Sequence, residues 1–109
     1  MFKIDPNPQF THTVKIRVPV DGGFREDTLK ATFRVIPTDE AKTFDLSEGS
    51  GSRDFLCRAI VNLDDIADAE GNPLPYNDAL RDQLLNFQYV RVGLGRAYFE
   101  GVAGARTGN

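Results

Sequence analysis

Apolar and polar residues alternate in two segments near the amino terminus, residues 13–20 and 28–35. A period of two is typical of a strand with one buried face. The apolar faces would consist of Val14, Ile16, Val18 and Val20 in the first segment and of Leu29, Ala31, Phe33 and Val35 in the second. Asp21-Gly22-Gly23 lies between the segments and can adopt positive φ, so the pattern predicts an antiparallel β-hairpin over about residues 13–36.

The opposite face of this predicted hairpin is polar and basic, with Lys15 and Arg17 on the first strand. Pro19 has no N–H to donate and therefore favours an edge position for the same strand. Because a two-stranded hairpin is marginal by itself, strand addition or homo-oligomerisation at its edge is a reasonable hypothesis. We therefore include Lys15 and Arg17 among the candidate partner-binding residues.

Helical spacing replaces alternation after the hairpin. Thr38 precedes two acidic residues and is predicted to cap a short helix that ends at about Leu46. Residues 47–52, SEGSGS, are typical of a flexible connection, and Ser52 is predicted to cap a second helix. The apolar residues of that second helix would be Phe55, Leu56, Ala59, Ile60 and Leu63.

The stretch DAEGNPLPYNDALRDQLL, residues 68–85, contains an acidic turn followed by two prolines. As a calcium-binding EF-hand loop with Gly71 at its sixth position, it would place Ile66 first, where an oxygen ligand is required, and Asn77 twelfth, where a glutamate is required, so it fails at both positions. As a phosphate loop it lacks Gly-Lys-Ser/Thr. Turn chemistry accounts for it better: it predicts a small hairpin that turns at residues 69–72, and a third helix capped by Asn77.

The last helical segment is apolar around most of its circumference. One face, predicted to meet the core, carries Val90, Leu94, Ala97 and Tyr98, while Arg96 and Glu100 are spaced for an ion pair. Its glycines weaken the helix unless something, such as another helix, packs closely against it. Val92, Phe99 and Val102 extend the apolar stripe, so they are candidate partner-binding residues; alternatively, the whole stripe is buried in the core.

Composition narrows the function classes further. A chain of 109 residues has single-domain length, so we expect one α+β domain over residues 1–109. The net charge of −3 argues against nucleic acid as a partner, and the lack of a long apolar segment predicts an unexported, cytoplasmic protein that does not span a membrane. Cys57 is the only cysteine and is interpreted as packing material.

Candidate chemistry is sparse. His12 is the only histidine, so a zinc site or a Cys-His nucleophile pair has little to build from, and we expect this histidine to be a solvated residue at the head of a strand. The carboxylates near the acidic turn, Asp64, Asp65, Asp68 and Glu70, are interpreted as a solvated turn rather than an acid/base pair. We therefore predict a non-enzymatic protein with no catalytic, cofactor-binding or metal-ligating residues, and no cofactor.

The carboxyl-terminal half, residues 55–109, resembles the tail assembly chaperone family of long-tailed bacteriophages and prophages. The shared layout is a helix, an acidic hairpin, a capped leucine-bearing helix and a final helix with a Gly-Ala-Arg ending. The matching residues are Asp68, Glu70, Gly71, Pro73, Pro75 and Tyr76 in the hairpin, then Leu80, Leu84 and Leu85, then Ala97, Tyr98, Gly104, Ala105, Arg106 and Asn109. Leu63 stands near a position where members often carry a tryptophan.

This resemblance implies a chaperone that binds the tape-measure protein, recruits tail-tube subunits and leaves before the virion is complete. It also implies the host cytoplasm as the location and, in many members, a frameshift-extended form that acts with the short form; this chain would be the short form. The alternative is a structural minor tail or head–tail connector protein that stays in the virion, since such proteins are also small, acidic and hairpin-bearing.

Overall fold

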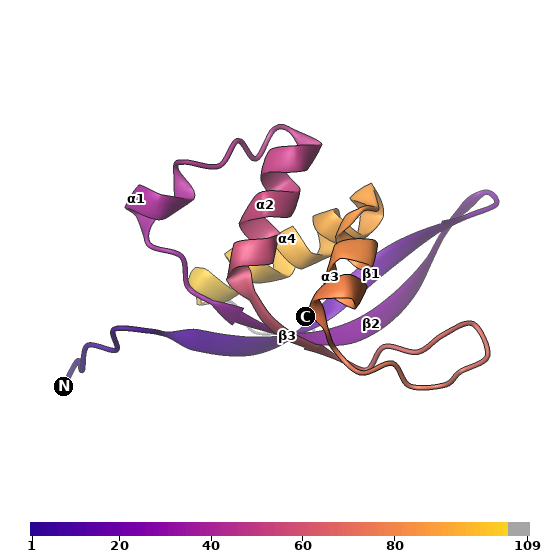
Figure 1. Cartoon of the computed structure of the whole chain (residues 1–109), viewed down its shortest axis with the longest axis horizontal. Helices are drawn as coiled ribbons and strands as arrows, with labels where there is room; N and C mark the ends of the chain where they lie inside the picture. The colour runs from indigo at the N-terminus through magenta and orange to yellow at the C-terminus, as the bar shows by residue number, and fades with distance from the viewer. Residues whose placement is uncertain (105–109) are drawn as a thin grey trace.

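The computed structural model describes residues 1–104, which fold into a three-stranded antiparallel sheet of order β1-β2-β3 and four helices (Figure 1). The elements are β1 (Gln9–Val20), β2 (Gly23–Arg34), α1 (Thr38–Ala41), α2 (Gly49–Ala59), β3 (Ile60–Asp64), α3 (Asp78–Leu85) and α4 (Gln88–Val102). The helices lie together on one side of the sheet (Figure 1). The predicted α+β class and the amino-terminal hairpin are confirmed.

The hairpin of β1 and β2 is longer than its alternating pattern indicated. Its pairing runs from Gln9↔Arg34 to Val20↔Gly23, and Gly22 adopts a φ of 77° in the two-residue turn. The central part carries the predicted buried face, which consists of Val14, Ile16, Leu29, Ala31 and Phe33. Beyond this face, residues 17–27 contain no buried side chain, and the tip of the hairpin projects past the helices (Figure 1).

A third strand occupies residues that were predicted to continue the second helix. Helix α2 ends at Ala59, and Ile60–Asp64 forms β3, which pairs with β2 from Lys30↔Asp64 to Phe33↔Ile60. Ile60 and Leu63 are buried, as expected, but in a strand that has a register shift opposite residues 32 and 33. The helical prediction was wrong here because two apolar residues three positions apart, such as Ile60 and Leu63, also suit a short, irregular edge strand.

The predicted starts of the first two helices were also wrong. Thr38 is the first residue of α1 and not its cap; Pro37 holds the cap position without a side-chain hydrogen bond. Helix α1 ends at Ala41 instead of continuing to Leu46. Helix α2 begins at Gly49, inside the segment predicted as a flexible connection, so Ser52 lies within the helix and does not cap it.

The acidic turn and the start of α3 follow the prediction. Ala67 and Pro73 form an isolated antiparallel bridge, and Gly71 takes a φ of 87° in the turn between them. The carboxylate of Asp68 accepts hydrogen bonds from the backbone N–H groups of residues 70 and 72, at 3.0 and 2.9 Å. The side chain of Asn77 accepts from the N–H of Leu80 at 2.7 Å, as an N-cap residue should.

The buried side chains form one cluster between the sheet and the helices. Tyr98 of α4 lies near its centre, with its ring edge-on to Phe33 and to Phe55 at centroid distances of 5.5 and 5.1 Å. The Tyr98 hydroxyl accepts a hydrogen bond from the buried N–H of Ile36 at 2.9 Å. The N–H of Ile36 lies just beyond β2, where the sheet offers it no acceptor, so the Tyr98 hydroxyl supplies its hydrogen bond.

Candidate partner-binding surface

Helix α4 lies against β1, and its glycines make that approach possible. A Cβ atom at Gly93 would lie 2.8 Å from the carbonyl oxygen of Lys15 and 2.7 Å from Cδ1 of Ile16. A Cβ atom at Gly101 would collide with the ring of Phe10. The close neighbour that the sequence led us to expect is therefore β1 of the same chain at these two glycines, and not another helix.

The outward side of α4 carries the predicted apolar residues in an accessible position. We call Val92, Gly95, Phe99 and Val102 the α4 stripe. Val92, Phe99 and Val102 are 49, 47 and 43% exposed, so the alternative in which all three are buried in the core is wrong. A Cβ atom at Gly95 would meet no described atom within 4 Å, which leaves a notch in the middle of the stripe.

Phe99 is held in place although half of it is exposed. Its ring stacks on the ring of buried Phe55 with a centroid distance of 5.7 Å and an interplanar angle of 11°. It also meets the ring of Tyr98 edge-on at 5.0 Å. One face of Phe99 is therefore anchored to the core, and a ring fixed in this way loses little conformational freedom when a partner covers it.

Leu46 enlarges this apolar surface. It is 45% exposed and lines a shallow pocket together with Val92 and Arg91. The Arg91 guanidinium donates to the carbonyl oxygen of Leu85 at 2.9 Å, which fixes this side of the pocket to the end of α3. Sequence reasoning missed Leu46 because it placed the residue at the end of a helix, whereas α1 ends five residues earlier.

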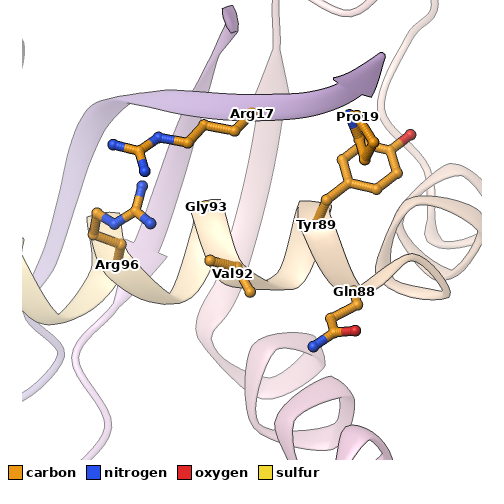
Figure 2. A pocket seen from close by; sticks show the side chains of 7 residues that line it. All are labelled: Arg17, Pro19, Gln88, Tyr89, Val92, Gly93 and Arg96. Atoms are coloured by element: carbon orange, nitrogen blue, oxygen red, sulfur yellow. The ribbon is translucent and has the colours of Figure 1, made fainter. Parts of the chain in front are cut away.

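A groove lies beside the contact between the first half of α4 and β1, and we call it the Arg17/Arg96 groove. It has a volume of about 330 Å³ and is lined by Arg17, Pro19, Gln88, Tyr89, Val92, Gly93 and Arg96. The guanidinium groups of Arg17, from β1, and of Arg96, from α4, point toward one another at one end (Figure 2). The structure thus brings together two of the predicted partner-binding residues, Arg17 and Val92.

The other predicted residues lie apart from this groove. Phe99 and Val102 follow Val92 along the α4 stripe, while Lys15 contributes its backbone carbonyl to the contact with Gly93. The predicted pair of Arg96 with Glu100 does not form in the part of the chain that the structure describes. Sequence reasoning missed Arg96 as a candidate binding residue because it assigned the side chain to that pair.

The remaining chemistry-bearing residues have structural surroundings. The thiol of Cys57 is half-buried and contacts a carboxylate oxygen of Asp82 at 3.7 Å, and burial raises the pKa of the thiol. A raised pKa disfavours the thiolate, which is the reactive form. His12 is half-buried within β1, edge-on to the Phe10 ring at 5.1 Å, and is not the solvated strand-end residue that was expected.

Residues 1–104 contain no group of three His, Cys, Asp or Glu side chains arranged to hold a metal ion. Over the same range, no helix has the length and apolar character needed to cross a lipid bilayer.

Comparison with known proteins gives no assignment: the chain matches no family model, no curated protein and no solved structure at a significant level. The resemblance to tail assembly chaperones therefore stays a prediction. Its Ala105, Arg106 and Asn109 lie outside the residues that the structure describes.

Proposed function

We propose that this protein is a non-enzymatic tail assembly chaperone of a long-tailed phage or prophage, which binds the tape-measure protein in the host cytoplasm and recruits tail-tube subunits. One observation supports it most directly: α4 presents an accessible apolar stripe on the side opposite its buried face. A chaperone for a long, apolar, helical protein needs a surface that binds without sequence-specific polar contacts. The α4 stripe and Leu46 have this character.

The notch at Gly95 suggests how a helix would sit on the stripe. Small residues let two helix backbones approach closely, and bulky residues on both sides of the notch can then contact the flanks of the bound helix. Val92 and Phe99 lie one turn before and after Gly95 on the same side of α4. The stripe thus offers a shallow binding groove about two helical turns long.

The first test is co-expression of the chain with the tape-measure protein encoded in the same genome. We expect a clear rise in soluble tape-measure protein that co-purifies with the chain. If the tape-measure protein stays insoluble, the experiment is repeated with any frameshift-extended form present, and a second failure would contradict the proposal.

A matched pair of variants separates binding from folding. Gly95→Gln places a good helix former in open space, so it should stabilise the chain while filling the notch. Ala79→Gln introduces the same side chain at an exposed position of α3, far from the stripe in sequence. We expect Gly95→Gln to reduce co-purification of tape-measure protein and Ala79→Gln to leave it unchanged; equal effects would place the binding surface elsewhere.

The alternative is a structural tail or connector protein retained in the virion, and the projecting tip of the hairpin favours it. Val20 and Phe24 near the tip are 44 and 56% exposed, which would suit an interlocking contact with a neighbouring subunit. The two functions differ in one measurable quantity. Mass spectrometry of purified virions should detect a structural protein in stoichiometric amounts, whereas a chaperone should be absent.

A further inference from the structure

We propose that the Arg17/Arg96 groove binds a carboxylate side chain of the tape-measure protein, presented within an otherwise apolar segment. This inference rests on the proposed function and adds the chemistry that the partner must supply. It also gives the chain a means to select one register on a long and repetitive apolar partner, since apolar contacts alone discriminate poorly between neighbouring positions.

The first support is the positive charge of the residues that line the groove. None of the residues that line the groove is acidic, and neither Arg17 nor Arg96 forms an ion pair with a described residue. Two guanidinium groups that face one another repel, and an anion between them converts the repulsion into two attractive contacts. A carboxylate suits such a place because guanidinium groups bind it through paired hydrogen bonds.

The second support is that Arg17 is partly pre-positioned. Its guanidinium lies over the ring of Phe24 on the neighbouring strand, 5.2 Å from the ring centroid. This cation–π contact restricts the long side chain before a ligand arrives. An arginine held in this way loses less conformational freedom on binding than a free surface arginine does.

The third support is the apolar character of most of the remaining lining of the groove. Tyr89, Pro19 and Val92 line it, and Val92 also belongs to the α4 stripe, so the groove continues the surface proposed for the tape-measure protein. A bound segment could place its carboxylate between the arginines and its neighbouring apolar side chains against Val92. The charge of the arginines and the apolar lining together favour an acidic residue flanked by apolar ones.

The backbone of β1 argues for recognition through side chains instead of strand addition. The N–H of Val35 donates to the carbonyl oxygen of Pro8, and backbone hydrogen bonding in an antiparallel pair repeats every second residue. The backbone groups of the even-numbered residues of β1 therefore point toward β2, and those of the odd-numbered residues point away from it. At this outer edge Lys15 is covered by Gly93 of α4, and Pro19 has no N–H. An added strand that runs past Lys15 and Pro19 would therefore lack hydrogen-bond partners at these two residues.

The chemistry of the groove can be tested without the tape-measure protein. The probes are N-acetyl-leucyl-glutamate amide and its glutamine counterpart, titrated into the full ¹⁵N-labelled chain and followed by NMR. We expect the glutamate probe to shift the Nε–H signals of Arg17 and Arg96 in the millimolar range, and the glutamine probe to shift them far less. Equal shifts with both probes, or shifts of the same size at exposed Arg53 of α2, would overturn the inference.

The partner itself is then tested with overlapping peptides that cover the tape-measure protein. Arg96→Gln should weaken binding of the best acidic peptide about tenfold, and changing that peptide's acidic residue to its amide should then have little further effect. Arg53→Gln is the matched control and should bind as the parent chain does. A loss that is the same for acidic and amide peptides would contradict carboxylate recognition.

Failure of this inference can be distinguished from failure of the proposed function. If Arg17→Gln and Arg96→Gln solubilise the tape-measure protein as well as the parent chain, the function stands and the groove has no part in it. If the parent chain solubilises nothing but the glutamate probe binds, the groove is a carboxylate site and the proposed partner is wrong.

Discussion

The contact between Gly93 and β1 can be measured by comparing two alanine substitutions on the same helix. Gly93→Ala and Gly95→Ala both replace a glycine inside α4, so both should gain about 0.5–1 kcal/mol from the better helix propensity of alanine. They differ in their surroundings. At position 95 the new methyl group would meet no described atom within 4 Å. At position 93 it would lie 2.8 Å from the backbone carbonyl oxygen of Lys15.

The cost at position 93 follows from what can move. Cδ1 of Ile16 is the end of a side chain and could shift, but the carbonyl oxygen of Lys15 belongs to the backbone of β1. To admit the methyl group, α4 and β1 must therefore separate. Overpacking of this kind typically costs about 1–3 kcal/mol. Because the propensity gain is common to both variants, the same range of about 1–3 kcal/mol is the expected difference between them.

The assay is urea denaturation followed by far-ultraviolet circular dichroism. We expect Gly95→Ala to unfold at a higher urea concentration than the parent chain and Gly93→Ala at a lower concentration than Gly95→Ala, with similar slopes. If Gly93→Ala were as stable as Gly95→Ala, the close approach of α4 to β1 would be wrong, and the groove between them would need another description.

Three further outcomes are expected from single substitutions. Asn77→Ala removes the cap of α3 and should lower the free energy of unfolding by about 1 kcal/mol in the same denaturation assay. Tyr98→Phe leaves the buried N–H of Ile36 without its acceptor and should lower the free energy of unfolding by about 1–3 kcal/mol in the same denaturation assay. The pKa of Asp68 lies below its ordinary value because the backbone N–H of Asn72 donates to its carboxylate. Because the Asp68 carboxylate is therefore protonated at a higher pH in the unfolded chain than in the folded one, its contribution to stability should be complete above about pH 4 and should fall as the pH drops through the lower folded-state pKa. The pH profile of Asp68→Asn should lack this contribution. If the proposed function is right, Asp68→Asn should bind tape-measure protein as the parent chain does.

The parts of the fold that could be predicted from the sequence are those set by local chemistry. The hairpin has a strict period of two and a turn that requires positive φ at Gly22. The cap at Asn77 and the turn at Gly71 depend on side chains and dihedral angles within a few residues. Local rules decide such features whatever the rest of the chain does.

The strand β3 could not be predicted in the same way. Its residues, IVNLD, are too few to show alternation, and Ile60 and Leu63 also suit the helix that precedes them. What ends α2 at Ala59 is the pairing of the next residues with β2, a contact made with residues about thirty positions earlier in the chain. The β-branched pair Ile60-Val61 was the one local signal for a strand, and it was weaker than the helical spacing.

The candidate surface depended on information that the sequence does not carry, namely the rotation of α4 about its own axis. A helix that is apolar around most of its circumference can turn several faces to the core. The rotation depends on two glycines: Gly93 packs against the backbone of β1, and Gly101 packs against the ring of Phe10. With these two glycines turned toward the sheet, Gly95 points outward. The glycines that looked equivalent in sequence thus have opposite roles: two fix the helix on its own sheet, and the third leaves a notch in the stripe. If the tape-measure protein binds there, substitutions at Gly93 should act on binding only through stability, whereas a bulky residue at Gly95 should reduce binding in a chain that is more stable than before.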